Sequence, residues 1–265
     1  MSLRILTAPD LAKALPMPVA IAAMRSAFST KAPIMPLRTA LPIQKQNATM
    51  LSMPAYLPDD NALGIKVIAV FPHNNTQNLP VVNGFVMLID AESGLPRALL
   101  NGAALTAIRT GSLSGLATDL LAKPNARQLA VLGSGPQALT QIEAVCAVRP
   151  IESITLYSRQ RSNAERLAAG LSSAFPKPQV VDSVAQATQT ADIICTATSA
   201  THPILTLAQV KPGTHINAIG SHTPTMQEIS ADLLAAAEVY VDQREAALAE
   251  AGEIIAALAA GQIQL

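Results

Sequence analysis

Apolar and polar positions follow two different patterns along the chain, and the change falls near Thr118. After that residue, short apolar runs are separated by segments in which apolar residues recur every three or four positions. Such runs predict strands, here at 128–133, 153–157, 179–182, 192–197, 215–219 and 238–242. The spaced segments predict helices, which include 136–148, 161–174 and 227–237. Strands that alternate with helices form a parallel sheet with right-handed crossovers, so residues 118–250 are predicted to form an α/β domain.

The first part of the chain, residues 1–117, is richer in proline and less regular. Helices are predicted near Pro18–Phe28 and at about 106–122. Strands are predicted at Thr49–Pro54, Ala62–Val70 and Gly84–Asp90, and a turn at Glu92-Ser-Gly94 lies between strand-like segments. This mixture predicts a separate α+β domain. At the other end of the chain, the alanine-rich segment 245–260 is predicted to be a helix.

The turn after the first α/β strand carries the most informative motif. Gly133, Gly135 and Ala138 stand at the spacing G-x-G-x-x-A, between an apolar strand and an apolar helix. The first glycine permits a tight turn, the second lets the backbone approach a pyrophosphate, and the small third residue lets helix and strand pack closely. Pro136 and Gln137 begin the helix, where free amides favour an anion. We therefore predict a Rossmann dinucleotide-binding domain, rather than a structural turn without a ligand.

The end of the second α/β strand indicates which dinucleotide is bound. An NAD site usually has Asp or Glu there, whereas this chain has Ser158, Arg159 and Arg161. Serine and arginine can bind a 2′-phosphate that a carboxylate would repel, so NADPH is predicted to be preferred over NADH. The alternative is a solvated loop with two surface arginines. Thr198, directly after the strand at 192–197, is a further candidate cofactor-binding residue.

Composition excludes several classes of function. The 265 residues are 50% hydrophobic, with 18 basic and 18 acidic side chains, so neither a nucleic-acid partner nor a polybasic membrane patch is expected. There is neither an 18-residue apolar stretch nor a signal-peptide pattern. Cys146 and Cys195 lie in apolar segments and are expected to be buried thiols, with neither a disulfide nor a metal site. We expect a cytoplasmic protein.

Three cations in the first domain lie in apolar surroundings. They are Arg38, Lys66 within a predicted strand and Arg109 within a predicted helix. Cations seldom occupy such positions without a partner. Separate structural salt bridges are one explanation. A shared anion, such as a substrate carboxylate, would explain all three together.

Seven stretches of the chain resemble the ornithine cyclodeaminase/mu-crystallin family. They are Met53–Tyr56, Leu63–Ile68, Leu79–Gly84, Asp90–Gly94, Ala104–Thr110, the glycine turn and Asn217–Pro224. The resemblance implies that Arg38, Lys66 and Arg109 bind the α-carboxylate of an amino or imino acid and that Thr110 contacts the cofactor. It also implies a homodimer whose interface is formed by the substrate-binding domain, residues 1–117. Family members continue for several dozen residues past Leu265, so residues 251–265 are expected to begin a C-terminal return segment that is cut short.

Two departures from the cyclodeaminase pattern indicate the reaction. Leu51 stands where cyclodeaminases have a glutamate, and Gly220-Ser221-His222 replaces a turn in which they have an aspartate that binds the substrate amine. Reduction of a cyclic imine needs neither carboxylate, and His222 can donate a proton or order a water, as histidine side chains do in enzymes that work near neutral pH. His73, His202 and His215 are expected to be structural. The Gly-Ser-His-Thr-Pro form resembles the Δ1-pyrroline-2-carboxylate reductases of this family.

These features together predict an NAD(P)H-dependent oxidoreductase acting on a CH–NH group. It would reduce Δ1-pyrroline-2-carboxylate or Δ1-piperideine-2-carboxylate to L-proline or L-pipecolate, with Lys66 and His222 as catalytic residues. The alternatives are an ornithine cyclodeaminase, which is a lyase, and a non-catalytic NADPH-binding protein similar to mu-crystallin.

Overall fold

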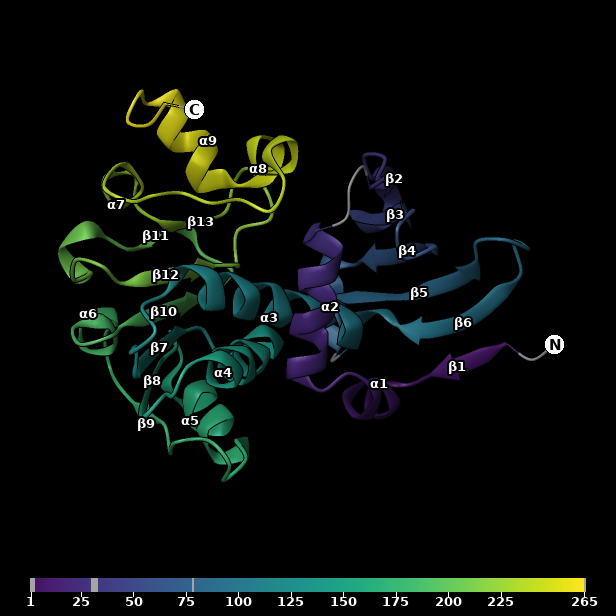
Figure 1. Cartoon of the computed structure of the whole chain (residues 1–265). Helices are drawn as coiled ribbons and strands as arrows, with labels where there is room; N and C mark the ends of the chain where they lie inside the picture. The colour runs from purple at the N-terminus through teal and green to yellow at the C-terminus, as the bar shows by residue number, and fades with distance from the viewer. Residues whose placement is uncertain (1–2, 30–32, 78, 265) are drawn as a thin grey trace. The chain divides into compact units, whose positions relative to one another are not determined.

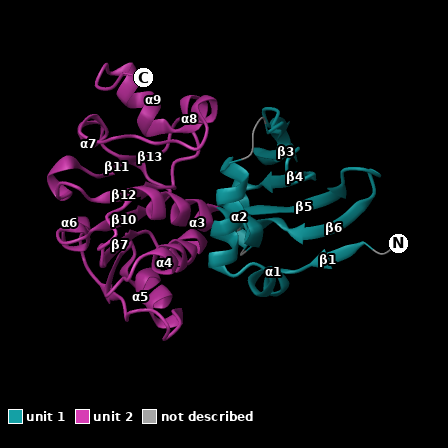
Figure 2. Ribbon diagram, viewed as in Figure 1, with its two compact units in different colours: residues 1–109 teal, residues 110–265 magenta. Residues whose placement is uncertain are grey.

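The computed structural model describes residues 3–29, 33–77 and 79–264, and it divides into two compact units, residues 1–109 and 110–265 (Figure 2). The boundary falls inside the helix α3 (Gly102–Leu121), whereas the sequence places it at 117/118. Within the described ranges, none of the helices is both long enough and apolar enough to cross a bilayer.

Unit 1 is built on a sheet with the strand order β1-β6-β5-β4-β3-β2 (Figure 1). Neighbouring strands are antiparallel, except that β1 pairs with β6 in parallel. Its strands are β1 (Arg4–Leu6), β2 (Thr39–Ile43), β3 (Ala48–Leu57), β4 (Ala62–Val70), β5 (Val82–Asp90) and β6 (Pro96–Asn101). Its helical segments are α1 (Ala8–Ala14), α2 (Met17–Ser29) and the 3-10 turns η1 (Gln44–Gln46) and η2 (Pro72–Gln77). The strands and the helix predicted at 18–28 are confirmed, and α3 confirms the helix predicted at 106–122.

The helix α1 is absent from the predictions, although the sequence contains its signal. Thr7 and Asp10 form a capping box, and proline occupies the first turn of the helix.

The two faces of the unit 1 sheet differ. Lys66 pairs with Val86, and Val86 pairs with Leu100, so these side chains share one face. Leu100 packs into a buried cluster with Leu11 of α1 and with part of α3. The opposite face displays large apolar side chains that stay exposed, among them Ile5 (70%), Leu41 (54%) and Phe85 (36%).

Unit 2 contains a parallel sheet with the strand order β12-β10-β7-β8-β9, as the predicted Rossmann topology requires. Its strands are β7 (Gln128–Leu132), β8 (Ser153–Tyr157), β9 (Gln179–Val180), β10 (Ile193–Thr196) and β12 (His215–Ala218). From β7 the chain runs outward to β8 and β9 and then returns to β10 on the other side of β7. The crevice between the carboxyl ends of β7 and β10 is therefore the topological switch point, where ligands of such sheets bind.

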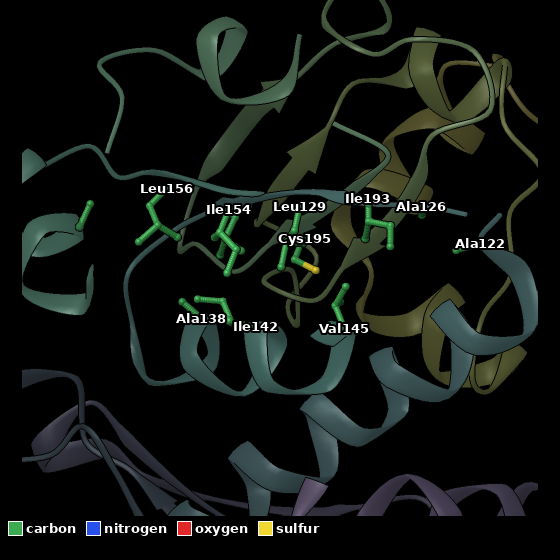
Figure 3. Close-up of a cluster of buried hydrophobic side chains, with 12 residues drawn as sticks. Ala122, Ala126, Leu129, Ala138, Ile142, Val145, Ile154, Leu156, Ile193 and Cys195 are labelled. Carbon is green, nitrogen blue, oxygen red and sulfur yellow. The ribbon is translucent and has the colours of Figure 1, made fainter. Parts of the chain in front are cut away.

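One buried cluster of unit 2 lies between this sheet and the helix α4 (Pro136–Val148), and a second includes Leu132, Ile194 and Leu205. Leu129, Ile154 and Ile193 of the sheet face Ala138, Ile142 and Val145 of α4, all at most 1% exposed (Figure 3). Cys195 is buried in the same cluster, and both cysteines are free thiols. Burial raises the pKa of Cys146 to about 11 and that of Cys195 to about 12, so both are inert at neutral pH.

Further elements complete unit 2 outside this sheet. They are α5 (Arg161–Gly170), α6 (Val184–Thr188), β11 (Thr201–Leu205), η3 (Leu207–Gln209), β13 (Gln227–Ile229), α7 (Ala231–Ala235), α8 (Arg244–Glu250) and α9 (Gly252–Ala259). β11 and β13 pair in parallel as a small separate sheet.

The prediction for the segment 227–242 is largely wrong. Residues 227–229 form β13, so the predicted helix shrinks to α7. The predicted strand at 238–242 is an irregular segment, and its Val239, Tyr240 and Val241 are exposed. An alternating pattern makes a strand only where a neighbouring strand can pair with it, and this segment pairs with no strand in the described residues.

Two predicted helices also differ in extent. The helix predicted at 161–174 ends at Gly170, ahead of two serines that favour turns. The helix predicted at 245–260 breaks at Ala251 into α8 and α9. A Cβ atom at Gly252 would lie 2.0 Å from the carbonyl oxygen of Met226, so α9 begins where the backbone packs directly on another segment.

Candidate functional site

The glycine turn has the local geometry that its motif predicts. Gly133 has a φ of +120°, and its amide donates to the carbonyl of Tyr157 at 2.8 Å. A Cβ atom on Gly133 would lie 2.3 Å from the carbonyl oxygen of Ala197, so no other residue fits. Ala138 is fully buried against the sheet. These two positions are explained by backbone conformation and packing.

Gly135 is different, because a Cβ atom there would meet no described atom within 4 Å. Open space at this residue fits the close approach of a ligand to the backbone. Gly135 caps α4, Pro136 follows in the first turn, and that turn carries no acidic residue, so the positive end of the helix dipole is free to attract an anion. The buried Oε1 of Gln137 accepts no hydrogen bond from the described residues. An orphaned acceptor beside free amides fits a dinucleotide.

The residues after β8 divide into two sets. Ser134 Oγ donates to Ser158 Oγ at 2.9 Å, which ties the glycine turn to the end of β8. Arg159 is exposed and has no ion-pair partner among the residues that the structure describes. Arg161 instead donates to Glu165 at 2.8 Å and also pairs with Asp182. Of the two predicted phosphate ligands, Arg159 is thus the one whose charge is not already matched.

The carboxyl ends of β10 and β12 carry the other candidates. Thr198 follows β10, and its methyl group would lie 3.4 Å from a Cβ atom on Gly133, so this loop flanks the glycine turn at the switch point. His222 follows β12, and its Nδ1 lies 2.9 Å from the carbonyl oxygen of Gly220. Because a carbonyl only accepts, Nδ1 carries the hydrogen. Nε2 of this exposed histidine has no partner among the described residues, so a proton can be donated or accepted there.

Hydrogen bonds to two other segments of unit 2 hold the turn that carries His222. Ser221 Oγ donates to the Met226 carbonyl at 2.7 Å and accepts from the Gly252 amide at 3.1 Å. Burial raises the pKa of the neighbouring Glu253 carboxyl. Glu228, which sequence reasoning missed, is fully buried and hydrogen-bonds both Thr198 and Gly220. Its only sequence signal is an acidic residue beside apolar Ile229 in a segment predicted to be a helix.

In unit 1, the structure brings two of the three predicted cations together. Lys66 of β4 is half-buried, and burial, followed by the nearby charge of Arg109, lowers its pKa to about 8. Arg38 directly precedes β2, whose first residue, Thr39, pairs with Ser52 of β3. Arg38 and Arg109 are exposed, so only Lys66 lies in the apolar environment that the sequence suggests for all three. Two adjacent cations, one of them desolvated, favour a bound anion.

Comparison with known proteins decides the family. The whole of residues 4–264 matches the description of the ornithine cyclodeaminase/mu-crystallin family. The chain belongs to this family. A Δ1-pyrroline-2-carboxylate reductase from Bacillus cereus is 44% identical over 229 residues, which are 86% of this chain and 70% of that protein.

Two solved structures of the family resemble this one over 99% of the chain. A Thermococcus litoralis Δ1-pyrroline-2-carboxylate reductase in complex with NADH and L-proline has a TM-score of 0.93 and 34% identity, with 82% of that chain covered. An archaeal alanine dehydrogenase dimer with bound NAD has a TM-score of 0.90 and 30% identity, with 81% covered. The expected family and fold class are confirmed.

Within the family's fold, the positions that depart from the cyclodeaminase pattern lie near the candidate residues. Leu51 pairs with Ile68, two residues beyond Lys66 and on the same face of the sheet. Thr110 is the first residue of unit 2 and directly follows Arg109 in α3. Among the described residues, no group of three or more His, Cys, Asp or Glu side chains could hold a metal ion.

Proposed function

We propose that the protein is an NAD(P)H-dependent reductase of a cyclic imino acid. It converts Δ1-pyrroline-2-carboxylate or Δ1-piperideine-2-carboxylate into L-proline or L-pipecolate. The Bacillus relative is a Δ1-pyrroline-2-carboxylate reductase, and the Thermococcus structure contains NADH and L-proline, which supports this substrate class. Within this chain, the observation that carries the proposal is His222, whose Nδ1 is tied to the Gly220 carbonyl and whose Nε2 is left for a proton.

The chain's own residues divide the work of binding and proton transfer. Lys66 and Arg109, assisted by Arg38, bind the substrate carboxylate, because their adjacent charges are relieved by an anion. The residues of the glycine turn, Gly133 to Ala138, would hold a nicotinamide cofactor, which would supply hydride for the imine carbon. His222 supplies a proton to the imine nitrogen from Nε2, directly or through an ordered water. The C=N bond thus gains one hydride and one proton and becomes the C–N bond of the cyclic amino acid.

The same residues argue against the lyase. Cyclodeamination needs carboxylates that bind a second ammonium group and accept protons. Leu51 supplies no charge, and a neutral or protonated His222 does not attract an ammonium group.

We further propose that NADPH is preferred over NADH. Ser158 and Arg159 lie where an NAD site usually has a carboxylate, and Arg159 is exposed with no ion-pair partner in the described parts of the chain. Gly133, Gly135, Pro136, Gln137, Ala138, Thr110 and Thr198 form the rest of the proposed cofactor site.

A homodimer is also part of the proposal. The face of the unit 1 sheet opposite Lys66 leaves Ile5, Leu41 and Phe85 exposed. Exposed apolar side chains gathered on one face of a sheet are typical of an interface between subunits.

A turnover assay tests the proposed reaction. We expect oxidation of NADPH when pyrroline-2-carboxylate or piperideine-2-carboxylate is supplied, and no proline or ammonia from ornithine. A rate with ornithine equal to the imine rate would overturn the reductase in favour of the lyase. Binding of NADPH without turnover of either imine would favour a non-catalytic binding protein.

A variant of His222 tests the proton donor. His222→Ala is expected to slow reduction by about 100-fold if the imidazole is the general acid, and by less if it orders a water. His202→Ala, which changes an exposed histidine of the same unit, serves as the control. An unchanged rate and pH profile in His222→Ala would remove His222 from the mechanism and leave the reaction class standing.

A further inference from the structure

Glu228 of β13 is an acidic side chain with no exposed surface. Its Oε1 accepts hydrogen bonds from the amide of Thr198 at 2.7 Å and from the hydroxyl of Thr198 at 2.6 Å. Its Oε2 accepts from the hydroxyl of Thr196 at 2.6 Å and from the amide of Gly220 at 2.8 Å. Each oxygen therefore accepts from a backbone N–H and lies beside a threonine hydroxyl, an arrangement of four donors that suits a carboxylate.

This carboxylate joins two loops that the sheet itself does not connect. The last backbone hydrogen bond between β10 and β12 runs from the Ile219 amide to the Thr196 carbonyl at 3.0 Å. Beyond that point the loops of Thr198 and Gly220 leave the sheet, and Glu228 bridges them from β13. The connection continues the pairing of the two strands past their carboxyl ends, where the ligand site of such a sheet lies.

Gly220 shows how closely the three residues fit. A Cβ atom on Gly220 would lie 2.4 Å from the Thr198 carbonyl oxygen and 2.5 Å from the carboxyl carbon of Glu228. Only glycine lets the turn approach the carboxylate, because a methyl group would collide with fixed backbone on one side and with the carboxylate on the other. The glycine of the Gly-Ser-His turn is thus explained by Glu228.

We propose that Glu228 is a positioning residue for imine reduction. Its carboxylate fixes the distance between the loop that carries the cofactor-binding Thr198 and the turn that carries the proton donor His222. This inference rests on the proposed function. A group held by a second layer of hydrogen bonds keeps its productive geometry, and loss of that layer typically lowers activity without altering the binding of distant parts of the substrate.

Glu228→Gln tests the proposal, because the amide keeps the size of the side chain but loses the charge and one acceptor. We expect kcat to fall by at least about tenfold and the Kd for NADPH to rise by about fivefold or more. The KM for the imine should stay within about twofold, since its carboxylate is bound by Lys66 and Arg109 of unit 1. If the role of Glu228 were purely structural, Glu228→Gln would lower the melting temperature without lowering kcat selectively over the KM for the imine.

Thr196→Val is the matched control. It removes a hydrogen bond to the same carboxylate and leaves the bonds to Thr198 and Gly220 in place, so kcat and the NADPH Kd should stay within about twofold of the wild type. Equal kcat and Kd values in Glu228→Gln and Thr196→Val would overturn the proposal. If wild type binds NADPH but does not reduce the imine, the proposed function fails, and the role of Glu228 is still decided by the NADPH Kd.

Gly220→Ala provides a second test of the proposal if Glu228→Gln does not fold. The added methyl group would push the turn away from the carboxylate while Glu228 stays bonded to Thr196 and Thr198. We expect the same loss of kcat with an unchanged KM for the imine. A folded Gly220→Ala variant with wild-type kcat would overturn the proposal.

Discussion

Lys66 and Arg109 place two positive charges close together, and the energetic consequence is visible at Lys66. Burial and, second, the charge of Arg109 lower the pKa of the amine to about 8. In the folded unit without ligand, the ammonium group of Lys66 therefore loses its proton more readily than an exposed lysine does. An anionic carboxylate would stabilise the charged form of Lys66, so substrate binding and protonation of Lys66 favour each other.

This coupling predicts a pH dependence. The value of kcat/KM for pyrroline-2-carboxylate, which reports the free enzyme, should fall as pH rises through about 8, because the neutral amine no longer attracts the carboxylate. Lys66→Met should lower kcat/KM at pH 7 by at least about tenfold, or about 1.4 kcal/mol, and should abolish this step. The protein should not lose stability at pH 7, because a lowered pKa means that the charged amine opposes folding below about 8.

Lys45→Met, which changes an exposed lysine of η1, is the control for that experiment. The imine substrate titrates too, so the comparison of the two variants isolates the contribution of Lys66. Identical pH profiles in Lys66→Met and Lys45→Met would show that Lys66 does not bind the substrate.

The two arginines after β8 give a second prediction for single residues. Arg159→Ala should weaken NADPH binding by about 1.5–3 kcal/mol and leave NADH binding nearly unchanged, because only NADPH carries the 2′-phosphate. Arg161→Ala should have a smaller effect, since that guanidinium is already paired with Glu165 and Asp182. The dissociation constants can be measured by calorimetry. Equal affinities of the wild type for the two cofactors would contradict the prediction.

Among the helices, α3 has an unusual C-terminus. The guanidinium of Arg149, whose side chain is 7% exposed, donates to the carbonyls of Thr118, Asp119 and Ala122 at 2.8–2.9 Å and of Lys123 at 3.0 Å. A cation there satisfies the last carbonyls of the helix and complements the negative end of its dipole. The pairing fixes the end of α3 against α4, because Arg149 directly follows α4.

Loss of this contact should be costly. Arg149→Met leaves several buried carbonyls without donors, so the free energy of unfolding should fall by about 3–5 kcal/mol in urea titrations. Arg127→Met removes a cation that pairs with Glu152 at the surface, where its side chain is 51% exposed, and should cost less than about 1 kcal/mol. Similar losses in the two variants would show that the Arg149 contacts contribute no more than a surface ion pair.

The elements also show how far the sequence could predict this structure. The strand, glycine turn and helix at 128–148 were predictable because the turn needs a positive φ at Gly133 and a small residue at Ala138, and both requirements are local. The structure of residues 227–242 was not predictable from the sequence. The strand β13 forms because it pairs with β11, whereas Val239–Val241 have no pairing strand in the described chain.

The same limit applies to the site. Arg159 and His222 could be selected from the chemistry of single positions. Glu228 could not, because its role depends on donors from Thr198 and Gly220 that only the fold brings to it.

At the scale of the whole molecule, the two units carry different sets of candidate residues. Unit 1 carries Lys66 on one face of its sheet, near the charge of Arg109 from α3, and Ile5, Leu41 and Phe85 are exposed on the other face. Unit 2 carries the glycine turn, Arg159 and His222. The exposed apolar face suits unit 1 to pack against a second copy.

This face predicts a homodimer that a single charge can disrupt. Phe85 lies in β5, within the sheet, so Phe85→Lys would bury an unpaired ammonium group in a subunit interface of this kind. We expect sedimentation equilibrium to give a dimer for the wild type and a monomer for Phe85→Lys, with little change in the melting of the isolated chain because the side chain is already 36% exposed. Leu120→Lys changes a leucine that is 63% exposed at the end of α3 and should remain dimeric. A dimer that survives Phe85→Lys would place the subunit interface elsewhere.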